Sequence, residues 1–356
     1  MAFPSAAGYS NLGQGNFSPV IYSKAVQLAF RKSSTVEAIT NNDYFGEIAN
    51  FGDSVKIIKE PEITVKEYKR GTQITAQDLD DQDFTLVVDQ GRYFAFKLDD
   101  IEQAHSHVNF MSLSTDRAGY RLRDSYDAEV LGYMSGFAPA AIGEIGTVAR
   151  TAPAGTKAIA TADSDELLAT MKLKKGSFAS ITTSSAGDHS IPVTPRLPGT
   201  TALPTDRVSP LQMIARMARQ LDTQFVDSNG RWLVVDPIFV EMLKDEDSRL
   251  LNADFGGAGL QNGLVLNNLH GFKVYVSNNL PKIGTGPGTA GTANQNTNFG
   301  VLVAGHESAV ATAEQITKTE SYRDPDSFAD VVRGMHLYGR KILRPEGIVT
   351  AKYNVA

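Results

Sequence analysis

A charged two-stranded ribbon that leads into a long helix is the feature that most constrains this fold. From Ser54 to Tyr68, β-forming and charged residues alternate, the period-2 pattern of a half-exposed strand. Arg70-Gly71-Thr72 breaks this strand, and a return strand follows over 83–98 with one apolar face, formed by Phe84, Leu86, Val88, Phe94, Phe96 and Leu98. A two-stranded ribbon is marginal in water and leaves unpaired N–H and C=O groups along its edges. We therefore expect a neighbouring copy to complete it.

Two polar segments interrupt the ribbon. The acidic run Asp78, Asp80, Asp81 and Asp83 lies between the strands and is predicted as a solvated tip. Its spacing resembles a calcium loop, but Asp83 replaces the turn glycine and the closing glutamate is absent. Residues 89–92 have turn composition within the return strand.

A helix over about 99–136 is predicted directly after the ribbon. Asp99 and Asp100 favour a helix N-terminus, and no proline occurs between Pro61 and Pro139. The expected inward stripe is narrow and consists of Ile101, Ala104, Val108, Met111, Thr115, Ala118 and Leu122. Such a helix approaches roughly 55 Å at 1.5 Å per residue. The alternative is two helices broken near Gly119, because glycine costs about 1 kcal/mol in a helix interior.

Composition excludes several classes of function. The 356 residues are 42% hydrophobic and 21% charged, which is typical of a globular protein of about two domains. The absence of cysteine excludes disulfides, a cysteine nucleophile and thiolate metal sites. A net charge of −6, from 34 basic and 40 acidic residues, argues against a basic nucleic-acid-binding domain. With no eighteen-residue apolar run, no membrane span is expected.

The first 23 residues carry no charge and are broken by glycine and proline, unlike a signal peptide. We expect an arm whose aromatic residues Phe3, Tyr9 and Phe17 dock on a neighbouring copy. The alternative is a disordered tail.

Residues 206–316 alternate strands and helices and are predicted as one mixed domain. Ser209-Pro210 with Gln212 is a helix start, and the stripe that follows is Leu211, Ile214, Ala218, Leu221 and Phe225. Strands are predicted at 231–235, 272–276 and 301–304, a second helix after Asp236-Pro237, and a short helix at Glu307–Gln315.

The end of the chain is predicted as two long strands, 328–342 and 348–355, with a turn at 345–347. We expect both to pair near the long helix, which gives a discontinuous domain from 99–140 and 318–356.

No residue set predicts catalysis, a cofactor or a metal. Gly286, Gly288 and Gly291 match a dinucleotide loop, but the helix that should follow is missing. His105 and His107 stand two apart, so on a helix they do not share a face and cannot bind one ion. His306-Glu307 lacks the second histidine of a zincin helix.

Four segments together resemble the major capsid protein of tailed double-stranded-DNA bacteriophages, particularly podophage-like and cyanophage-like versions. They are EITVKEYKRGTQITAQDLDDQDFTLVVDQGRYFAFKLDDIEQA, GRWLVVDPIFVEMLKD, GFKVYVSNNLP and FGVLVAGHESAVATAEQITKTESYRDPDSFADVVRGMHLYGRKILRPEGI. The resemblance covers most of the chain from about residue 40 onward.

This resemblance implies an α+β protein with the Hong Kong 97-type capsid fold. The implied parts are an N-terminal arm (1–50), an extended β-hairpin loop (51–98), a peripheral domain with a long spine helix (99–140 and 318–356), and an axial domain (141–317).

The resemblance also implies partners. Copies assemble as hexamers and pentamers of an icosahedral head that encloses double-stranded DNA, in the virion after assembly in the cytoplasm of a host bacterium. A portal and a cement or decoration protein are further implied partners. Because no charged helical leader precedes the arm, a separate scaffolding protein is expected.

Candidate inter-subunit residues are the basic side chains of the ribbon, Lys56, Lys59, Lys66, Lys69 and Arg70, together with the arm aromatics Phe3, Tyr9 and Phe17. Exposed ion pairs contribute only about 0–1 kcal/mol each, and the alternative is that the lysines keep a strand edge soluble. Two other functions stay open: an encapsulin-like compartment shell and a dinucleotide-dependent enzyme.

Overall fold

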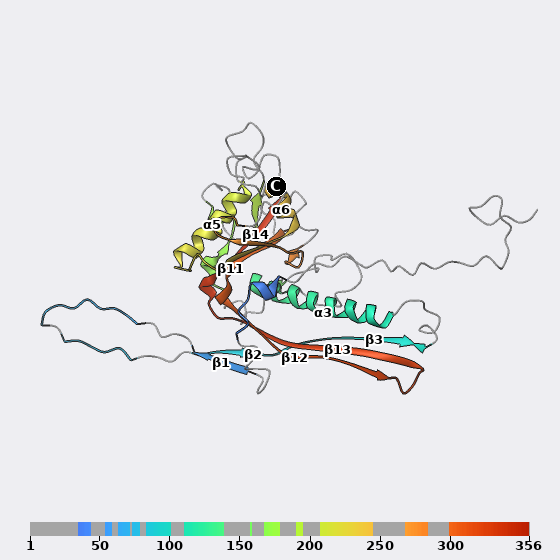
Figure 1. Cartoon of the computed structure of the whole chain (residues 1–356). Helices are drawn as coiled ribbons and strands as arrows, with labels where there is room; N and C mark the ends of the chain where they lie inside the picture. Colours follow the sequence, from blue (N-terminus) through green and yellow to red (C-terminus); the bar gives the residue numbers. More distant parts are fainter. Residues whose placement is uncertain are drawn as a thin grey trace, which may run out of the picture.

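The structure is a computed structural model. It describes residues 35–43, 54–58, 63–71, 73–78, 83–100, 110–138, 157–158, 167–178, 190–194, 207–244, 268–283 and 299–355. An upper body built on one sheet, a long flat sheet beside helix α3, and a loop that extends far from both form an elongated molecule (Figure 1).

The long flat sheet has three antiparallel strands in the order β12-β13-β3, which are Val310–Arg323, Ala329–Ile342 and Gln90–Asp99. Helix α3 (Phe110–Ser135) lies along one face of it (Figure 1). The helix is continuous through Gly119, so the alternative of two helices is wrong.

The contacts of α3 differ from the predicted stripe. Met111, Thr115, Ala118 and Leu122 are only half-buried, whereas Ile101, Ala104 and Val108 lie outside the described residues. The fully buried apolar residues lie in the C-terminal half: Tyr126, Val130, Leu131, Tyr133 and Met134.

The upper body is a seven-stranded mixed sheet in the order β6-β14-β11-β8-β9, with β10 on β11 and β7 on β14. Its main strands are β8 (Arg231–Val235), β9 (Lys273–Val276), β11 (Phe299–His306) and β14 (Ile348–Val355). The short strands are β6 (Lys172–Leu173), β7 (Ile191–Val193) and β10 (Lys282–Ile283).

Both faces of this sheet are buried. Leu233 and Val235 of β8 pack with helices α5 (Pro210–Thr223) and α6 (Pro237–Lys244), while Trp232 and Val234 pack with the C-terminal half of α3. Burial on both faces explains why 232–235 is a continuous apolar run rather than an alternating one.

The smaller elements complete the chain. They are the pair β1 (Ser54–Ile58) and β2 (Asp83–Val87), the pair β4 (Phe137–Ala138) and β5 (Lys157–Ala158), and the 3-10 turns η1 (Val36–Ala38), η2 (Ala169–Met171), η3 (Lys175–Ser177), η6 (Glu307–Ala309) and η7 (Pro345–Gly347). None of the helices in the described ranges is long and apolar enough to cross a membrane.

The predicted ribbon is confirmed only near its base. β1 pairs with β2, but β3 leaves the ribbon and pairs with β13. The chain turns at Arg70 and Gly71, where Gly71 has φ of +90°, so Asp78 and Asp83 of the acidic run are not at the tip. Asp80 and Asp81 lie outside the described residues. The predicted return strand is thus two strands in different sheets, bent at Val88 and Asp89.

Three predictions in the second half of the chain are wrong. β14 pairs with β11 in the upper sheet instead of near the long helix, so only β13 of the two end strands joins the long flat sheet. Glu307–Gln315 is a 3-10 turn followed by β12, not a helix. Phe225 lies beyond the end of α5 and is 97% exposed, rather than on its buried stripe.

The start of α5 is as predicted. The Ser209 hydroxyl accepts from the Gln212 N–H at 3.2 Å, and Leu211, Ile214, Ala218 and Leu221 face the core. Asp236 likewise caps α6 by accepting from the Phe239 N–H at 2.9 Å.

Phe225→Gly is expected to raise the free energy of unfolding by about 1 kcal/mol, because a non-glycine residue in the left-handed region is strained and glycine is preferred after a helix. Phe225 has φ of +55° and buries almost nothing. Urea denaturation followed by circular dichroism measures the change. Gly136→Ala is the opposite control, since Gly136 has φ of +77° and an added Cβ would lie 2.9 Å from Leu167 Cδ1.

Candidate assembly surfaces

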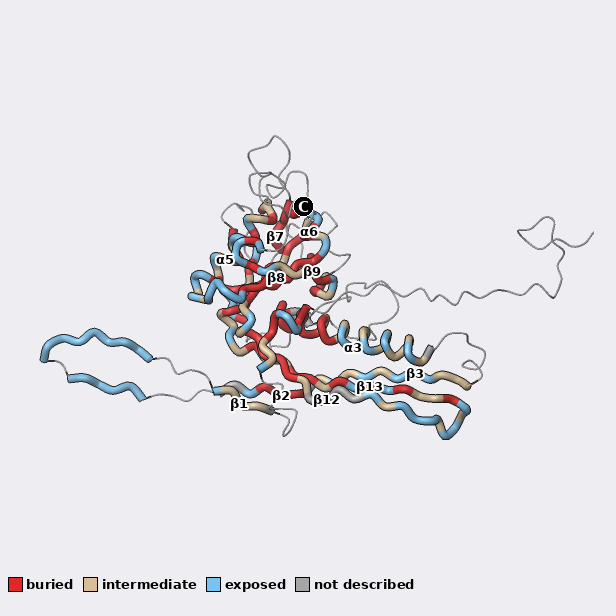
Figure 2. Tube along the Cα trace, in the orientation of Figure 1, coloured by how far each residue is buried: buried red, intermediate tan, exposed pale blue. Residues whose placement is uncertain are grey.

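The extended loop (63–71 with 73–78) is the most exposed part of the described chain (Figure 2). Its two sides are joined by side chains rather than by a strand ladder. The Thr64 N–H donates to Gln77 Oε1 at 3.1 Å, and Lys66 Nζ donates to Thr75 Oγ1 at 3.2 Å. Its apolar side chains are mostly exposed to solvent, with exposed fractions of 69% for Ile63, 96% for Val65, 66% for Tyr68 and 80% for Ile74.

The predicted basic residues fall in two groups. Lys56 is exposed on β1, and Lys66, Lys69 and Arg70 are exposed around the turn of the extended loop. The structure therefore brings the last three together at one end of the molecule. Lys59 and the arm aromatics Phe3, Tyr9 and Phe17 lie outside the described residues.

A second exposed surface is the outer face of the three-stranded sheet, defined here by Tyr93, Ala95, Lys97, Arg333 and Met335. Alternate residues of β3 point to opposite faces, and Arg92 bonds to α3, so Tyr93 points away from the helix. Tyr93 is 81% exposed and stands opposite Met335, which is 43% exposed. Sequence analysis missed this face, although the alternation in YFAFKL was a usable signal.

Charged pairs border the outer face. Arg333 bonds to Glu320 at 2.9 Å and lies 5.1 Å over the ring of Tyr322. Lys97 bonds to Asp324 at 2.7 Å, and this hydrogen bond is the main cause that lowers the pKa of Asp324 to about 2. These ion pairs therefore hold the charged side chains in place at the far end of the sheet.

The inner face of the same sheet is polar where it meets α3. Glu129 is buried and accepts from Arg92 at 3.0 Å and from the Tyr338 hydroxyl, with Arg340 at 3.3 Å. Burial raises the pKa of Tyr338, and the Glu129 carboxylate adds to this effect, so the phenol stays protonated and donates. One carboxylate thus connects α3 to both β3 and β13.

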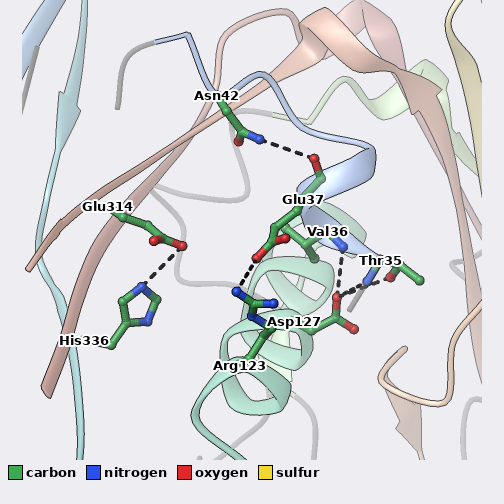
Figure 3. Close-up of polar contacts among 8 residues, drawn as sticks. All are labelled: Thr35, Val36, Glu37, Asn42, Arg123, Asp127, Glu314 and His336. Carbon is green, nitrogen blue, oxygen red and sulfur yellow. Dashed lines mark hydrogen bonds and ion pairs between the residues drawn. The ribbon is translucent and has the colours of Figure 1, made fainter. Parts of the chain in front are cut away.

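Asp127, two residues earlier and on another side of α3, holds the N-terminal segment 35–42 (Figure 3). One carboxylate oxygen accepts from the N–H groups of Thr35 at 2.8 Å and Val36 at 2.9 Å. The other accepts from Asn279 Nδ2 at 2.7 Å. Asp127 is 1% exposed, so it joins three separate parts of the chain in the interior.

The segment 35–42 also contacts β12. The Asn41 N–H donates to the Val310 carbonyl at 2.9 Å, the Thr312 N–H donates to the Asn41 carbonyl at 3.1 Å, and Thr40 bonds to Thr312 through their hydroxyls at 3.0 Å. Glu37 forms an ion pair with Arg123 of α3 at 3.4 Å (Figure 3). Residues 35–42, which belong to the predicted arm (1–50), are therefore fixed to the body.

His336 and Glu314 form a further, partly buried contact, with Nε2 and Oε1 3.3 Å apart (Figure 3). The hydrogen bond from His336 is the main cause that lowers the pKa of Glu314 below its ordinary value. The pair lies beside the ring of Tyr126, whose centroid is 5.4 Å from that of His336.

The other candidate sites gain no support. No group of three or more His, Cys, Asp and Glu residues that could hold a metal occurs in the part of the chain that the structure describes. His306 accepts from the Ser308 N–H at 3.2 Å and caps a turn. His105, His107, Gly286, Gly288 and Gly291 lie outside the described residues.

Comparison with known proteins shows which family the chain matches. Residues 86–351 match the model of a family described as phage capsid protein. None of the curated proteins matches the chain significantly.

Solved structures match over nearly the whole length. A chain of Mycobacterium phage Che8 is 25% identical with a TM-score of 0.64, covering 94% of this chain and 97% of its own. The capsid of cyanophage P-SCSP1u is 19% identical with a TM-score of 0.63, covering 100% and 99%. The capsid of Ralstonia phage GP4 is 12% identical with a TM-score of 0.63, also covering 100% and 99%. The last two show the fold alone, which is the Hong Kong 97-type capsid fold.

Asp127→Ala is expected to lower the free energy of unfolding by about 2–4 kcal/mol, because two N–H groups lose a buried charged acceptor. Residues 35–42 should also become accessible to protease. Urea denaturation and limited proteolysis followed by mass spectrometry measure both effects. Asp116→Ala is the matched control, since Asp116 is exposed on the same helix. An unchanged cleavage rate at 35–42 would show that Asp127 does not hold this segment.

The lowered pKa of Glu314 predicts an acid-dependent loss of stability. A carboxyl group with a folded pKa below its ordinary value of 4.5 stabilises the fold above that value, and its contribution is lost as pH falls through the folded pKa. Denaturation midpoints measured from pH 7 to pH 3 should therefore fall more steeply in the wild type than in Glu314→Gln. The same slope in both proteins would exclude a role for the pair.

Proposed function

Since this chain belongs to the phage capsid protein family and is a major capsid protein that forms the shell of a phage head, we propose that the extended loop joins its copies into hexamers and pentamers. The loop of one copy lies on the outer face of the next copy's three-stranded sheet. The observation that carries the proposal is the loop itself, with Ile63, Val65, Tyr68 and Ile74 all at least 66% exposed.

Apolar burial supplies the driving force. A large apolar side chain contributes about 1.5–3 kcal/mol when it is fully buried, whereas an exposed ion pair contributes about 0–1 kcal/mol. Tyr93 and Met335 on the outer face are the apolar surface for the loop to cover. Burial of these groups therefore outweighs the contribution of the ribbon lysines.

Charge sets the register of the loop on the neighbouring copy's sheet. Lys66, Lys69 and Arg70 surround the loop turn, while Asp326 is exposed at the far end of the sheet. The neighbouring Asp324 and Asp330 are already paired with Lys97 and Arg323. Complementary charge favours one alignment and speeds encounter more than it adds affinity. The predicted role of these basic residues is thus alignment.

The contact is heterologous, because loop and outer face are different surfaces of the same chain. Heterologous contacts close into rings when the rotation between copies closes, and rings of this kind can tile a shell. Loop and sheet point to opposite ends of the molecule, an arrangement that suits head-to-tail joining (Figure 1).

The other predicted roles belong to this proposal. They are the arm (1–50), the loop region (51–98, with β3 reassigned to the flat sheet), the peripheral domain (99–140 and 318 onward, with β14 reassigned) and the axial domain (141–317 with β14). Packaged double-stranded DNA, a scaffolding protein, a portal, a decoration protein and assembly in the host cytoplasm remain predictions from the family. The family and its relatives are structural proteins, and we assign no catalytic residue.

Val65→Asp combined with Ile74→Asp is expected to leave the subunit folded and to reduce closed shells by at least tenfold, because the carboxylates oppose burial of the loop. Sedimentation and negative-stain microscopy measure shells, and circular dichroism measures folding.

Val65→Ile combined with Ile74→Val is the control that keeps the loop apolar, and it should assemble as the wild type does. Normal shells from the aspartate variant would contradict the proposed contact. Particles that carry a cargo enzyme instead of DNA would favour an encapsulin-like shell.

A further inference from the structure

The root of the extended loop rests on the outer face of the three-stranded sheet. Leu86 and Val88 are buried in a small cluster with Ala311 and Ala313 of β12, and Val55, Ile57, Leu337 and Leu343 pack around it. Ala313 stands opposite Gly339 of β13 in the ladder. We call Ala311, Ala313 and Gly339 the loop seat. All three are small residues.

Gly339 permits a contact that no other residue could make. A Cβ at this position would lie 2.3 Å from the Val87 carbonyl oxygen and 3.0 Å from Val88 Cα. These are backbone atoms, so no side-chain rotation relieves the clash. Gly339 is not among the glycines with positive φ, so the close approach, and not the backbone conformation, requires glycine here.

The loop seat lies beside the point where the chain passes from the β1–β2 pair to the three-stranded sheet. β3 follows β13 up to the pair Gln90–Tyr338, and Gly339 is the next residue of β13. On the other side, Val88 and Asp89 lie between the strands, and β2 then pairs with β1 instead. The direction in which β2 leaves the flat sheet is therefore decided within these few residues.

We propose that Gly339 is a positioning residue for assembly, which sets the angle at which the extended loop leaves the subunit. The inference rests on the proposed function, because the angle matters only if the loop reaches a neighbour. From Ile58 to Gly71 the chain spans up to about 40 Å at 3.3 Å per residue. A rotation of about 10° at the root therefore moves the loop turn by about 7 Å, more than one residue of register.

Gly339→Ala tests this role. The variant is expected to fold with a cooperative melt, to form at least tenfold fewer uniform shells, and to yield open or irregular particles, measured by calorimetry and cryo-electron microscopy. Gly91→Ala is the matched control on the same face, because a Cβ there meets only Leu337 Cδ1 at 3.7 Å, an ordinary contact. It should assemble as the wild type does.

A distance measurement separates this inference from the proposed function. The chain contains no cysteine, so Glu67→Cys with Asp116→Cys places two spin labels on the loop and on α3 of the full-length chain. In unassembled subunits, Gly339→Ala should shift or broaden the label distance, whereas Gly91→Ala should not. An unchanged distance overturns the inference, whatever the shells do. A shifted distance with normal shells also overturns the assembly role.

Should Gly339→Ala fail to fold, Leu86→Ala tests the same root from the other side without a clash. It is expected to broaden the distance distribution and to reduce uniform shells while the melt stays cooperative. An unchanged distribution would overturn the inference. If the aspartate variants in the loop leave the shells normal, only the proposed contact is contradicted. The label distance tests the inference separately, because it is measured within one subunit.

Discussion

The burial of the C-terminal half of α3 between the two sheets is the interaction on which the rest of the structure depends. Val130 and Leu131 share one core with Trp232 and Val234 of the upper sheet and with Tyr338 and Ile342 of the flat sheet. Burial of a leucine or valine side chain contributes about 1.5–3 kcal/mol to the free energy of unfolding. Without this helix, the two sheets would lose the apolar core that joins them.

Polar contacts give that apolar core its geometry. Asp127 and Glu129 lie two residues apart, on different sides of the same buried stretch, and they hold different partners: the segment 35–42 with Asn279, and the strands β3 and β13. A buried carboxylate is costly unless its oxygens are bonded, so an arrangement with other partners is disfavoured. The surfaces that face a neighbour are thereby carried on a body with fixed internal angles.

Local signals in the sequence predicted the elements well and their partners less well. The Ser209 cap and the stripe of α5 depend on neighbouring residues, and the structure confirms them. The pairing of β14 depends on residues far away in the sequence. The sequence indicates only that 328–342 and 348–355 are extended strands, so it does not distinguish their sheets. Asp127 was not predicted, because a single aspartate in a helix looks like a solvated residue. The basic residues at the loop turn were predicted, but the outer face was not.

The segment 35–42 has one more effect on the flat sheet. β12 is an edge strand, and an exposed edge invites pairing with any other strand. Asn41 bridges to Ala311 and caps the first residues of this edge, and a bulge between Glu314 and Ile316 interrupts it further along. Edge-to-edge pairing of β12 with a strand of another copy is therefore disfavoured along these residues.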